Sequence, residues 1–341
     1  MFSSAWSLSA FILLFSIAIL FALLKYLYLA KVDSFKLDGR HVLVTGGSKG
    51  IGKALALEAA RRGASVTIVA RNQNQLKDTC DQLRQICDIN AVSSGKGQRA
   101  QWFALDVTDG FDSTRSTFEK AVQNLGTIDV LINNAGGSVQ AAFDQLASDS
   151  FQSQIQLNYL SAVYATRAVV PAMKERRSGR VLLVSSAAGQ IGIWGYTAYS
   201  ASKFALRGFA EALQMELTPY DVRVTVVYPP NTATDGFQQE LKSMPKEVRL
   251  ISETAGLFDP KDVAKKALDD AEAGHYSSYF GIDGWMLQTL SAGAAPETNP
   301  VRAVQQVVLA GLLRFVILVY QKNFDKIVLQ CKLEREVDKE D

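Results

Sequence analysis

Three side chains in the middle of the sequence have the types and spacing for proton transfer. Tyr199 and Lys203 are four residues apart, so on a helix they share one face about one turn apart. A phenol titrates near pH 10, and an ammonium at about 4 Å could lower the pKa of Tyr199 by up to about three units, to near 7. Such a pair is usually a surface feature by itself. Ser186, at the end of a predicted strand, makes it a catalytic candidate, because α/β sheets gather reacting groups at strand ends.

A glycine-rich turn earlier in the chain has the form of a phosphate cradle. The sequence Gly46-Gly47-Ser48-Lys49-Gly50-Ile51-Gly52 follows an apolar run directly and opens an amphipathic helical pattern. Glycines permit a tight turn and let backbone N–H groups approach a pyrophosphate at a helix N-terminus. We therefore predict that a dinucleotide is bound by Gly46, Ser48, Lys49, Gly50, Ile51 and Gly52.

The next apolar run indicates which dinucleotide is bound. It ends Val69-Ala70-Arg71 and offers no carboxylate for the ribose 2′-hydroxyl of NAD. The planar guanidinium of Arg71 can pair with a 2′-phosphate, and Lys49 adds a second cation. The alternative is that Arg71 is only a solvated strand end. The pattern favours NADPH over NADH.

The elements that must position these residues alternate between strands and helices. Apolar runs typical of buried strands are His41–Thr45, Ser65–Ala70, Gln101–Leu105, Ile128–Asn133, Arg180–Ser185 and Val222–Tyr228. Helical patterns between them include Ile51–Arg62, Gln73–Cys87, Ser113–Leu125 and Phe151–Lys174. Because parallel strands need crossovers, this alternation predicts an α/β fold, a doubly wound Rossmann sheet with helices on both faces. The polar stretch Asn90–Arg99 is predicted to be a surface loop.

Taken together, these motifs resemble the short-chain dehydrogenase/reductase family. The matching pieces, in the family's order over roughly residues 38–235, are Thr45-Gly46-x-x-x-Gly50-x-Gly52, Leu105-Asp106-Val107, Asn133-Asn134-Ala135-Gly136, Asn158, Ser186 and Tyr199-x-x-x-Lys203. The resemblance implies that Tyr199 protonates a carbonyl while hydride arrives from the nicotinamide. It also implies that Lys203 lowers the pKa of the tyrosine and binds the nicotinamide ribose. Ser186 would hydrogen-bond the developing oxyanion, and Asn158 would hold a water that feeds protons to the lysine.

The resemblance also assigns residues to the rest of the cofactor. Asp106 and Val107 would meet the adenine, and Asn133 with its adjacent backbone would line the cofactor. The chain departs from the family at Tyr228-Pro229-Pro230-Asn231-Thr232, where Pro-Gly is usual. Thr232 still fits as a contact to the nicotinamide amide, although Pro230 removes a donor and stiffens the backbone.

Three further segments resemble one group within the family, the reductases that act on the 3-keto group of a long-chain base in sphingolipid synthesis. They are Tyr228-Pro229-Pro230-x-Thr232, Arg249–Thr254 and Gly281–Leu287, and the apolar segment before the tail adds to the resemblance. The implied substrate is a long-chain keto base, reduced by NADPH at the cytosolic face of the endoplasmic reticulum. A membrane-bound steroid or retinoid oxidoreductase would share every catalytic residue, and a non-catalytic membrane scaffold would share the fold.

Apolar segments lie at both ends of the sequence. Ala5–Leu24 is an uncharged 20-residue run, about one bilayer crossing, with basic residues after it. It is predicted to be an uncleaved anchor that leaves the main domain in the cytosol, with a cleaved signal peptide as the alternative. Val304–Tyr320 is apolar but interrupted, so it could cross the bilayer, lie at its surface or pack on the domain. The predicted division is 1–31 for the anchor, 32–295 for the reductase domain, and 296–341 for an apolar segment and a charged, solvated tail from Lys332.

Composition excludes several other classes of protein. The net charge of +2 argues against a dedicated nucleic-acid binder. Three cysteines and two distant histidines form no cluster with metal-ligand spacing, so no metal site is predicted. The resemblance to the family also implies a homo-oligomer paired through Phe151–Lys174 and Ala198–Pro219, but apolar helix faces serve the core equally well.

Overall fold

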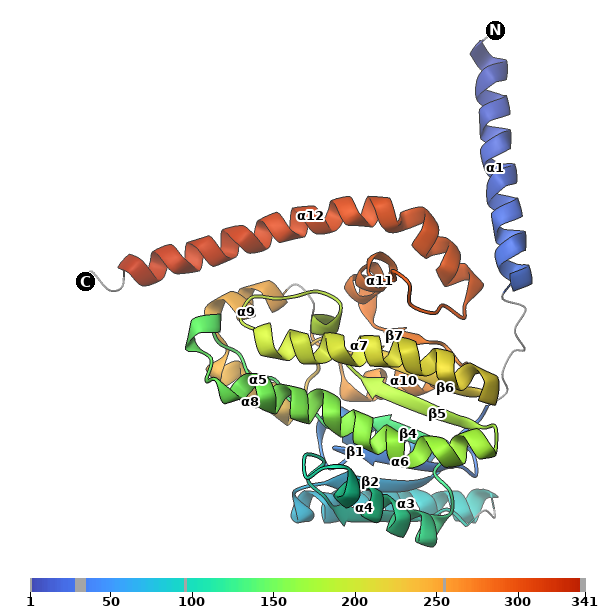
Figure 1. Cartoon of the computed structure of the whole chain (residues 1–341), viewed down its shortest axis with the longest axis vertical. Helices are drawn as coiled ribbons and strands as arrows, with labels where there is room; N and C mark the ends of the chain where they lie inside the picture. Colours follow the sequence, from blue (N-terminus) through green and yellow to red (C-terminus); the bar gives the residue numbers. More distant parts are fainter. Residues whose placement is uncertain (1, 28–34, 95–96, 254–255, 338–341) are drawn as a thin grey trace.

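Seven parallel strands form the centre of the molecule. The computed structural model describes residues 2–27, 35–94, 97–253 and 256–337. The sheet has the order β3-β2-β1-β4-β5-β6-β7, and every pairing is parallel (Figure 1). The strands are β1 (His41–Thr45), β2 (Ser65–Ala70), β3 (Ala100–Ala104), β4 (Val130–Asn133), β5 (Gly179–Val184), β6 (Val222–Tyr228) and β7 (Ser277–Tyr279).

Helices cover both faces of this sheet, and each face has its own hydrophobic core. One core joins the strands to α2 (Gly50–Arg61), α3 (Gln73–Ser94) and α10 (Pro260–Glu272). The other joins them to α4 (Phe111–Leu125), α6 (Ser161–Glu175) and α7 (Thr197–Leu217). A short helix, α5 (Asp149–Ile155), leads into α6 through a π-helical segment, Gln156–Leu160. The predicted doubly wound sheet is therefore confirmed.

One sequence expectation about the elements is wrong, and one strand was not predicted. Asn90–Arg99 is not all loop, because α3 continues to Ser94. The helix is held there because Asn90 Nδ2 donates a 3.0 Å hydrogen bond to the Ala60 carbonyl of α2. The strand β7 was not predicted, because a three-residue Ser-Ser-Tyr segment has no apolar run to mark it.

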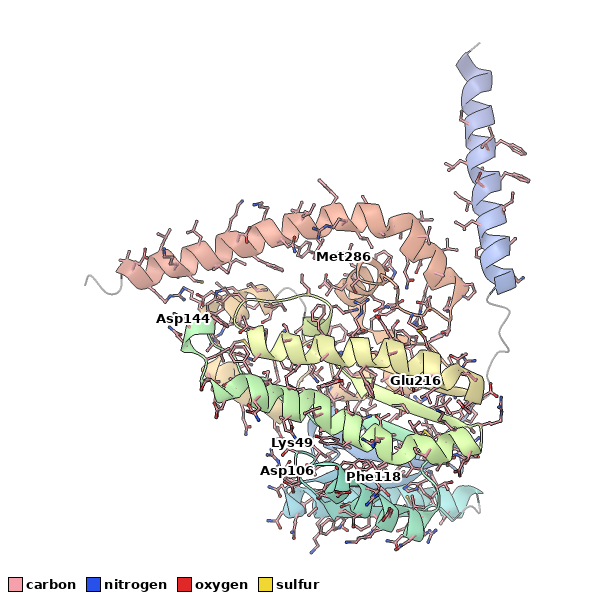
Figure 2. All side chains as sticks on the ribbon, in the orientation of Figure 1. Lys49, Asp106, Phe118, Asp144, Glu216 and Met286 are labelled. Carbon is pink, nitrogen blue, oxygen red and sulfur yellow. The ribbon has the colours of Figure 1, made fainter. Side chains whose placement is uncertain are left out.

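The C-terminal part of the chain forms further helices beside the sheet. These are α8 (Asp235–Ser243), α9 (Lys246–Ser252), α11 (Gly281–Leu290) and α12 (Pro300–Val337). The helix α12 contacts α11 and α9, and Figure 1 shows it lying across the domain. Figure 2 places Met286 of α11 beneath α12. The sequence left Val304–Tyr320 to cross the bilayer, lie at its surface or pack on the domain. In the structure the segment packs on the domain.

The end of α12 corrects a further expectation. The tail from Lys332 is not simply solvated, because α12 continues to Val337 and its last turns dock on α9. Arg335 pairs with Glu247, which is only 1% exposed, and Glu334 pairs with Lys246. These ion pairs join residues 88 positions apart, so the local pattern of charge could not reveal them. Residues 338–341 lie outside the described residues.

Two helices bear on membrane association. Within the described residues, α12 is the one helix long and apolar enough to cross a membrane. The N-terminal helix α1 (Phe2–Leu27) contains a shorter apolar run, Ser9–Ala22, and projects away from the domain (Figure 1). The predicted boundary between residues 31 and 32 lies outside the described residues. The proposed anchor and its orientation therefore stay predictions.

Candidate active site

A cavity of about 630 Å³ opens at the carboxyl ends of the strands. Its wall contains residues of the loops after β1, β4, β5 and β6, together with residues of α8, α11 and α12. Most of the predicted site residues line it, namely Gly46, Ser48, Lys49, Gly50, Ile51, Arg71, Asp106, Val107, Ser186, Tyr199, Lys203 and Thr232. The other three predicted residues, Gly52, Asn133 and Asn158, lie behind this surface.

The glycine turn after β1 has the backbone that a phosphate cradle needs. Gly46 and Gly50 have φ angles of +65° and +57°, which residues other than glycine rarely adopt. A Cβ on Gly52 would lie 2.3 Å from the Gly46 carbonyl oxygen, so α2 can approach the turn only with glycine there. The turn therefore presents backbone at the N-terminus of α2, where a pyrophosphate binds.

Asn134 holds this turn in place, although the sequence did not mark it as a site residue. Its Nδ2 donates to the carbonyl oxygens of Thr45 and Gly46 at 3.1 and 3.2 Å. The backbone N–H groups of Asn134 and Ala135 donate in turn to Thr45 Oγ1. Neighbouring Asn133 faces the other way, and its buried Nδ2 donates a 3.0 Å hydrogen bond to Thr166 of α6. The structure thus gives Asn133 a place in the core and Asn134 the place beside the cradle.

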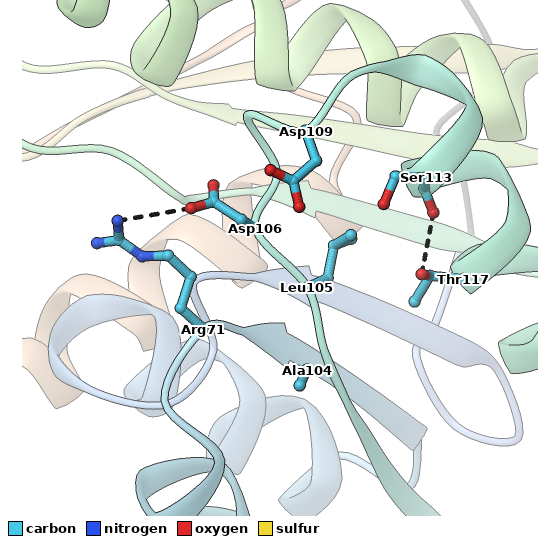
Figure 3. Close-up of a pocket in the computed structure, with 7 residues that line it drawn as sticks. All are labelled: Arg71, Ala104, Leu105, Asp106, Asp109, Ser113 and Thr117. Atoms are coloured by element: carbon cyan, nitrogen blue, oxygen red, sulfur yellow. Dashed lines mark hydrogen bonds and ion pairs between the residues drawn. The ribbon is translucent and has the colours of Figure 1, made fainter.

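Arg71 and Asp106 lie together at the far end of the cavity (Figure 3). Their Nη1 and Oδ2 atoms are 3.7 Å apart, and the Arg71 side chain is 75% exposed. Burial alone would raise the pKa of Asp106, but hydrogen bonds from Thr108 and the charge of Arg71 hold it below its usual value. A more open hollow of about 400 Å³ borders the same two residues. The guanidinium is largely exposed at this end of the cavity, so the residues present fit a dinucleotide.

Tyr199 and Ser186 meet at the centre of the cavity. Tyr199 lies in the first turns of α7, and its hydroxyl hydrogen-bonds the side chain of Ser186, which follows β5. Burial raises the pKa of Tyr199 to about 12, the hydrogen bond with Ser186 opposes the rise, and the charge of Glu240 adds to it. Tyr199 is therefore a neutral phenol here, and the expectation of a tyrosine pKa near 7 is wrong for this arrangement.

Lys203 shows why the tyrosine is not acidified. Its ammonium donates a 2.9 Å hydrogen bond to the Val184 carbonyl and lies 5.7 Å from the centre of the Tyr199 ring. Lys203 is 4% exposed, and burial lowers its pKa to about 8. The shared helix face predicted from the four-residue spacing is correct, but the ammonium points to the backbone of β5 rather than to the phenol.

Asn158 lies in the π-helical segment, a kind of irregularity that often marks functional sites. Its amide is fully engaged, since Oδ1 accepts from Gly137 N and Nδ2 donates to Gly137 O and Ser202 Oγ, each at 3.0 Å. A Cβ on Gly136 would lie 2.7 Å from Asn158 Oδ1 and 3.3 Å from Lys203 Nζ. Asn158 therefore fixes the backbone beside Lys203, and the water that it was predicted to hold stays a prediction.

Several wall residues were not among the predicted site residues, although the segments 250–290 and 304–320 were expected to lie on the path of the substrate. On the substrate side the cavity is bounded by Tyr196, Glu240, Met286 and Leu287, and by Ile317, Tyr320 and Phe324 of α12. The residues of α12 recur at the spacing of one helix face, a signal present in the sequence. It could not be assigned to the site, because apolar faces of this kind also serve the core or a membrane. Thr232, as predicted, lines the cavity, and its hydroxyl donates to the Pro230 carbonyl at 2.8 Å.

Comparison with known proteins gives consistent results over nearly the whole chain. Residues 40–245 match the family model described as short chain dehydrogenase. A 3-dehydrosphinganine reductase of Danio rerio is 45% identical over 93% of this chain and 94% of its own length. A 3-ketodihydrosphingosine reductase of Mus musculus is 45% identical over 92% of this chain and 94% of its own. A protein with that second name from Dictyostelium discoideum is 33% identical over 93% of this chain and 96% of its own.

Proposed function

Since the chain belongs to the short-chain dehydrogenase family, we propose that it reduces the 3-keto group of 3-ketodihydrosphingosine to an alcohol, giving dihydrosphingosine. The observation that carries this proposal is the composition of one cavity. It joins a glycine cradle, a neutral Tyr199 hydrogen-bonded to Ser186, and an apolar wall supplied by α12. The names of relatives that match this chain almost from end to end support the choice of ketone.

The side chains at the centre of the cavity can handle the proton of a ketone reduction. NADPH, when bound, supplies hydride to the carbonyl carbon. Tyr199 is neutral because of its burial, so it has a proton to give to the carbonyl oxygen. Ser186 is placed to donate a hydrogen bond to the same oxygen as negative charge develops there. Lys203, with a pKa lowered to about 8, can return a proton to Tyr199 after each turnover once its ammonium turns from the Val184 carbonyl.

The residues present support NADPH as the cofactor. The exposed guanidinium of Arg71 borders the end of the cavity where the second strand finishes, and no acidic residue follows that strand directly. Lys49 lies in the glycine turn and also lines the cavity. A 2′-phosphate would take Arg71 from Asp106, exchanging a single exposed ion pair at 3.7 Å for a stronger, doubly charged partner.

The two faces of α12 support a place at the membrane surface. Leu313 and Ile317 are buried on the inner face, whereas Leu312, Phe315 and Val319 are 62%, 66% and 57% exposed on the outer face. A helix with an apolar outer face suits the boundary between headgroups and acyl chains. Each methylene is worth about 0.8 kcal/mol when buried, so a long-chain base resides in the bilayer. We place α12 at the cytosolic surface of the endoplasmic reticulum membrane, with α1 anchoring the chain in that membrane. The substrate would enter the cavity beneath α12.

The test is a reconstituted reaction. Purified protein in lipid vesicles is incubated with NADPH and 3-ketodihydrosphingosine, and the product is identified by mass spectrometry. We expect dihydrosphingosine together with an equal amount of oxidised cofactor. Turnover of a steroid or retinoid ketone in preference to the keto base would overturn the proposal, and the lack of any NADPH oxidation with a panel of ketones would indicate a non-catalytic scaffold.

A further inference from the structure

Glu240 of α8 is an acidic side chain in the wall of the cavity, on the substrate side. The charged residues among the described lining are Lys49, Arg71, Asp106, Lys203, Glu240 and Asp283. The first three lie at the glycine turn and its neighbouring strand ends, and Lys203 donates to the Val184 carbonyl. Across the part of the chain that the structure describes, no basic nitrogen lies within 4.0 Å of the Glu240 carboxylate. A carboxylate without a cation is costly in such a position.

The immediate surroundings of Glu240 leave one buried acceptor without a donor. The Ser138 hydroxyl hydrogen-bonds its carboxylate, and Gln140 Nε2 lies 3.5 Å from Oε2. The same amide nitrogen donates a 3.0 Å hydrogen bond to the Tyr196 hydroxyl. Gln140 Oε1 is buried and accepts no hydrogen bond from any described residue. Burial raises the pKa of Glu240, and only the Ser138 hydrogen bond opposes the rise. A ligand that brings positive charge and N–H donors would pair with the Glu240 carboxylate and with Gln140 Oε1.

Glu240 is also close to the reacting groups. Its negative charge raises the pKa of Tyr199 and that of Tyr196, the residue three positions before it. The two tyrosine rings have centroids 5.2 Å apart. Gln140 Nε2 lies 3.5 Å from the Glu240 carboxylate and 3.0 Å from the Tyr196 hydroxyl, so Glu240 lines the same part of the cavity as the tyrosines beside which a substrate carbonyl would bind.

We propose that the Glu240 carboxylate binds the ammonium group of the substrate. The inference rests on the proposed function, because 3-ketodihydrosphingosine carries an amine on the carbon next to its keto carbon. The three N–H donors of an ammonium match the carboxylate, with one to spare for Gln140 Oε1. An uncharged ketone would leave the carboxylate desolvated and unpaired, so Glu240 selects for amino ketones and against neutral ones such as steroids.

The experiment compares two ketones that differ in the amine alone. Full-length wild-type protein and Glu240→Gln are assayed in vesicles with 3-ketodihydrosphingosine and with 1-hydroxyoctadecan-3-one, the same chain without the amine. A hydrogen bond to a charged group is worth about 1.5–3 kcal/mol, so we expect kcat/KM for the amino ketone to fall about 10- to 100-fold, mainly through KM. For the neutral ketone we expect no fall. Equal losses on both ketones would overturn the inference.

Two control variants sharpen this comparison. Glu216→Gln removes an exposed carboxylate of α7, outside the cavity, and should keep the wild-type preference for the amino ketone. Asp283→Asn removes the other carboxylate on the substrate side. If Asp283→Asn loses the preference for the amino ketone and Glu240→Gln keeps it, the ammonium binds Asp283 rather than Glu240. That result would overturn the inference.

A binding measurement separates this inference from the proposed function. Should the wild-type protein reduce neither ketone, the proposed function fails, but the ammonium site can still be tested. Octadecylamine and octadecanol are titrated into the full-length protein with NADP⁺ in detergent micelles. We expect Glu240→Gln to weaken binding of the amine by about tenfold and to leave binding of the alcohol unchanged. Equal amine binding by the variant and the wild type would overturn the inference.

Discussion

At the scale of single residues, Tyr199 keeps its proton because its pocket gives a phenolate little solvation. The hydrogen bond with Ser186 favours the phenolate, whereas burial and the charge of Glu240 oppose it. A cation next to Glu240 would cancel part of that opposition. Substrate binding through an ammonium would therefore bring the pKa of Tyr199 down at the moment when its proton is needed.

The first prediction concerns this proton. Tyr199→Phe removes the phenolic hydrogen and leaves the ring, so we expect kcat to fall by about 10²- to 10⁴-fold, the usual contribution of a general acid. NADPH binding, followed by the fluorescence of the cofactor, should change little. A variant that keeps full turnover would contradict the role of Tyr199, and Tyr196→Phe provides a matched control on the neighbouring ring.

The second prediction concerns the pH dependence. Because burial lowers the pKa of Lys203 to about 8, the lysine is charged below that pH and neutral above it. Tyr199 stays protonated over the same range, since its pKa is about 12. A neutral Lys203 has no proton to return to Tyr199, so reduction should slow as the pH rises through about 8, measured as kcat for the ketone.

A comparison with Lys203→Arg checks whether the decline in rate near pH 8 is due to Lys203. Arginine stays charged at every accessible pH, so the variant should lose the decline near pH 8 even if its overall rate is lower. The same decline in the variant and the wild type would show that another group titrates.

The spacing in the sequence identified Ser186, Tyr199 and Lys203 as a group, and the cavity brings all three together. What spacing could not supply was the direction of the lysine ammonium, which depends on a backbone carbonyl of β5. Glu240 was missed for a similar reason. A single glutamate on a short amphipathic helix looks like a solvated residue until the loops after β4 and β5 are placed around it.

At the scale of elements, α12 is held at both ends and spans the cavity between them. Near its start Arg302 donates to Asp270 at 3.0 Å, and near its end Arg335 pairs with the buried Glu247. Burial alone would raise the pKa of Asp270, but His275 and Lys266 hold it well below its usual value. Ile317, Tyr320 and Phe324 lie between these two fixed points and form part of the cavity wall.

The third prediction is made for the C-terminal end of α12. Arg335→Leu leaves the buried Glu247 carboxylate without its cation, so the last turns of the helix should separate from α9. We expect faster amide hydrogen exchange in residues 325–337 and a higher KM for the long-chain ketone, with little change in the sheet. Arg314→Leu, an exposed arginine on the same helix, should show neither effect. Unchanged exchange in Arg335→Leu would show that the ion pair does not hold the helix.

The strands were easier to predict than the contacts between distant elements. Six of the seven strands follow apolar runs of the kind that fully buried parallel strands require, and their predicted bounds lie within about two residues of those observed. The contact of α12 with α9 depends on residues far apart in the chain, so no local pattern contains it. The π-helical turn around Asn158 was equally hidden, because its sequence reads as ordinary helix.

At the scale of the whole molecule, the strand order separates the two ends of the cavity. Arg71 and Asp106 follow β2 and β3 at one edge of the sheet, whereas α11 and α12 lie over β7 at the other (Figure 1). The basic side chains Lys49 and Arg71 therefore lie at the end that would hold a nucleotide, and the apolar side chains of α12 lie at the end that would hold a lipid chain. The separation was implicit in the predicted alternation of strands and helices, but the side covered by α12 was not.

The fourth prediction belongs to the charged end. Arg71→Ala removes the guanidinium available to a 2′-phosphate, so we expect KM for NADPH to rise about tenfold or more while KM for NADH changes little. Steady-state rates with both cofactors give the ratio directly. An equal preference for NADPH in the variant and the wild type would contradict the assignment. Arg84→Ala, an exposed arginine of α3 outside the cavity, is the matched control.

The position of α12 over one sheet edge, with the glycine turn toward the other, has a kinetic consequence. If the lipid enters beneath α12 and the nucleotide enters at the glycine turn, neither obstructs the other. We therefore expect random-order binding of the two substrates. An inhibitor bound beneath α12 would then slow catalysis without competing with the abundant cellular pool of nicotinamide coenzyme.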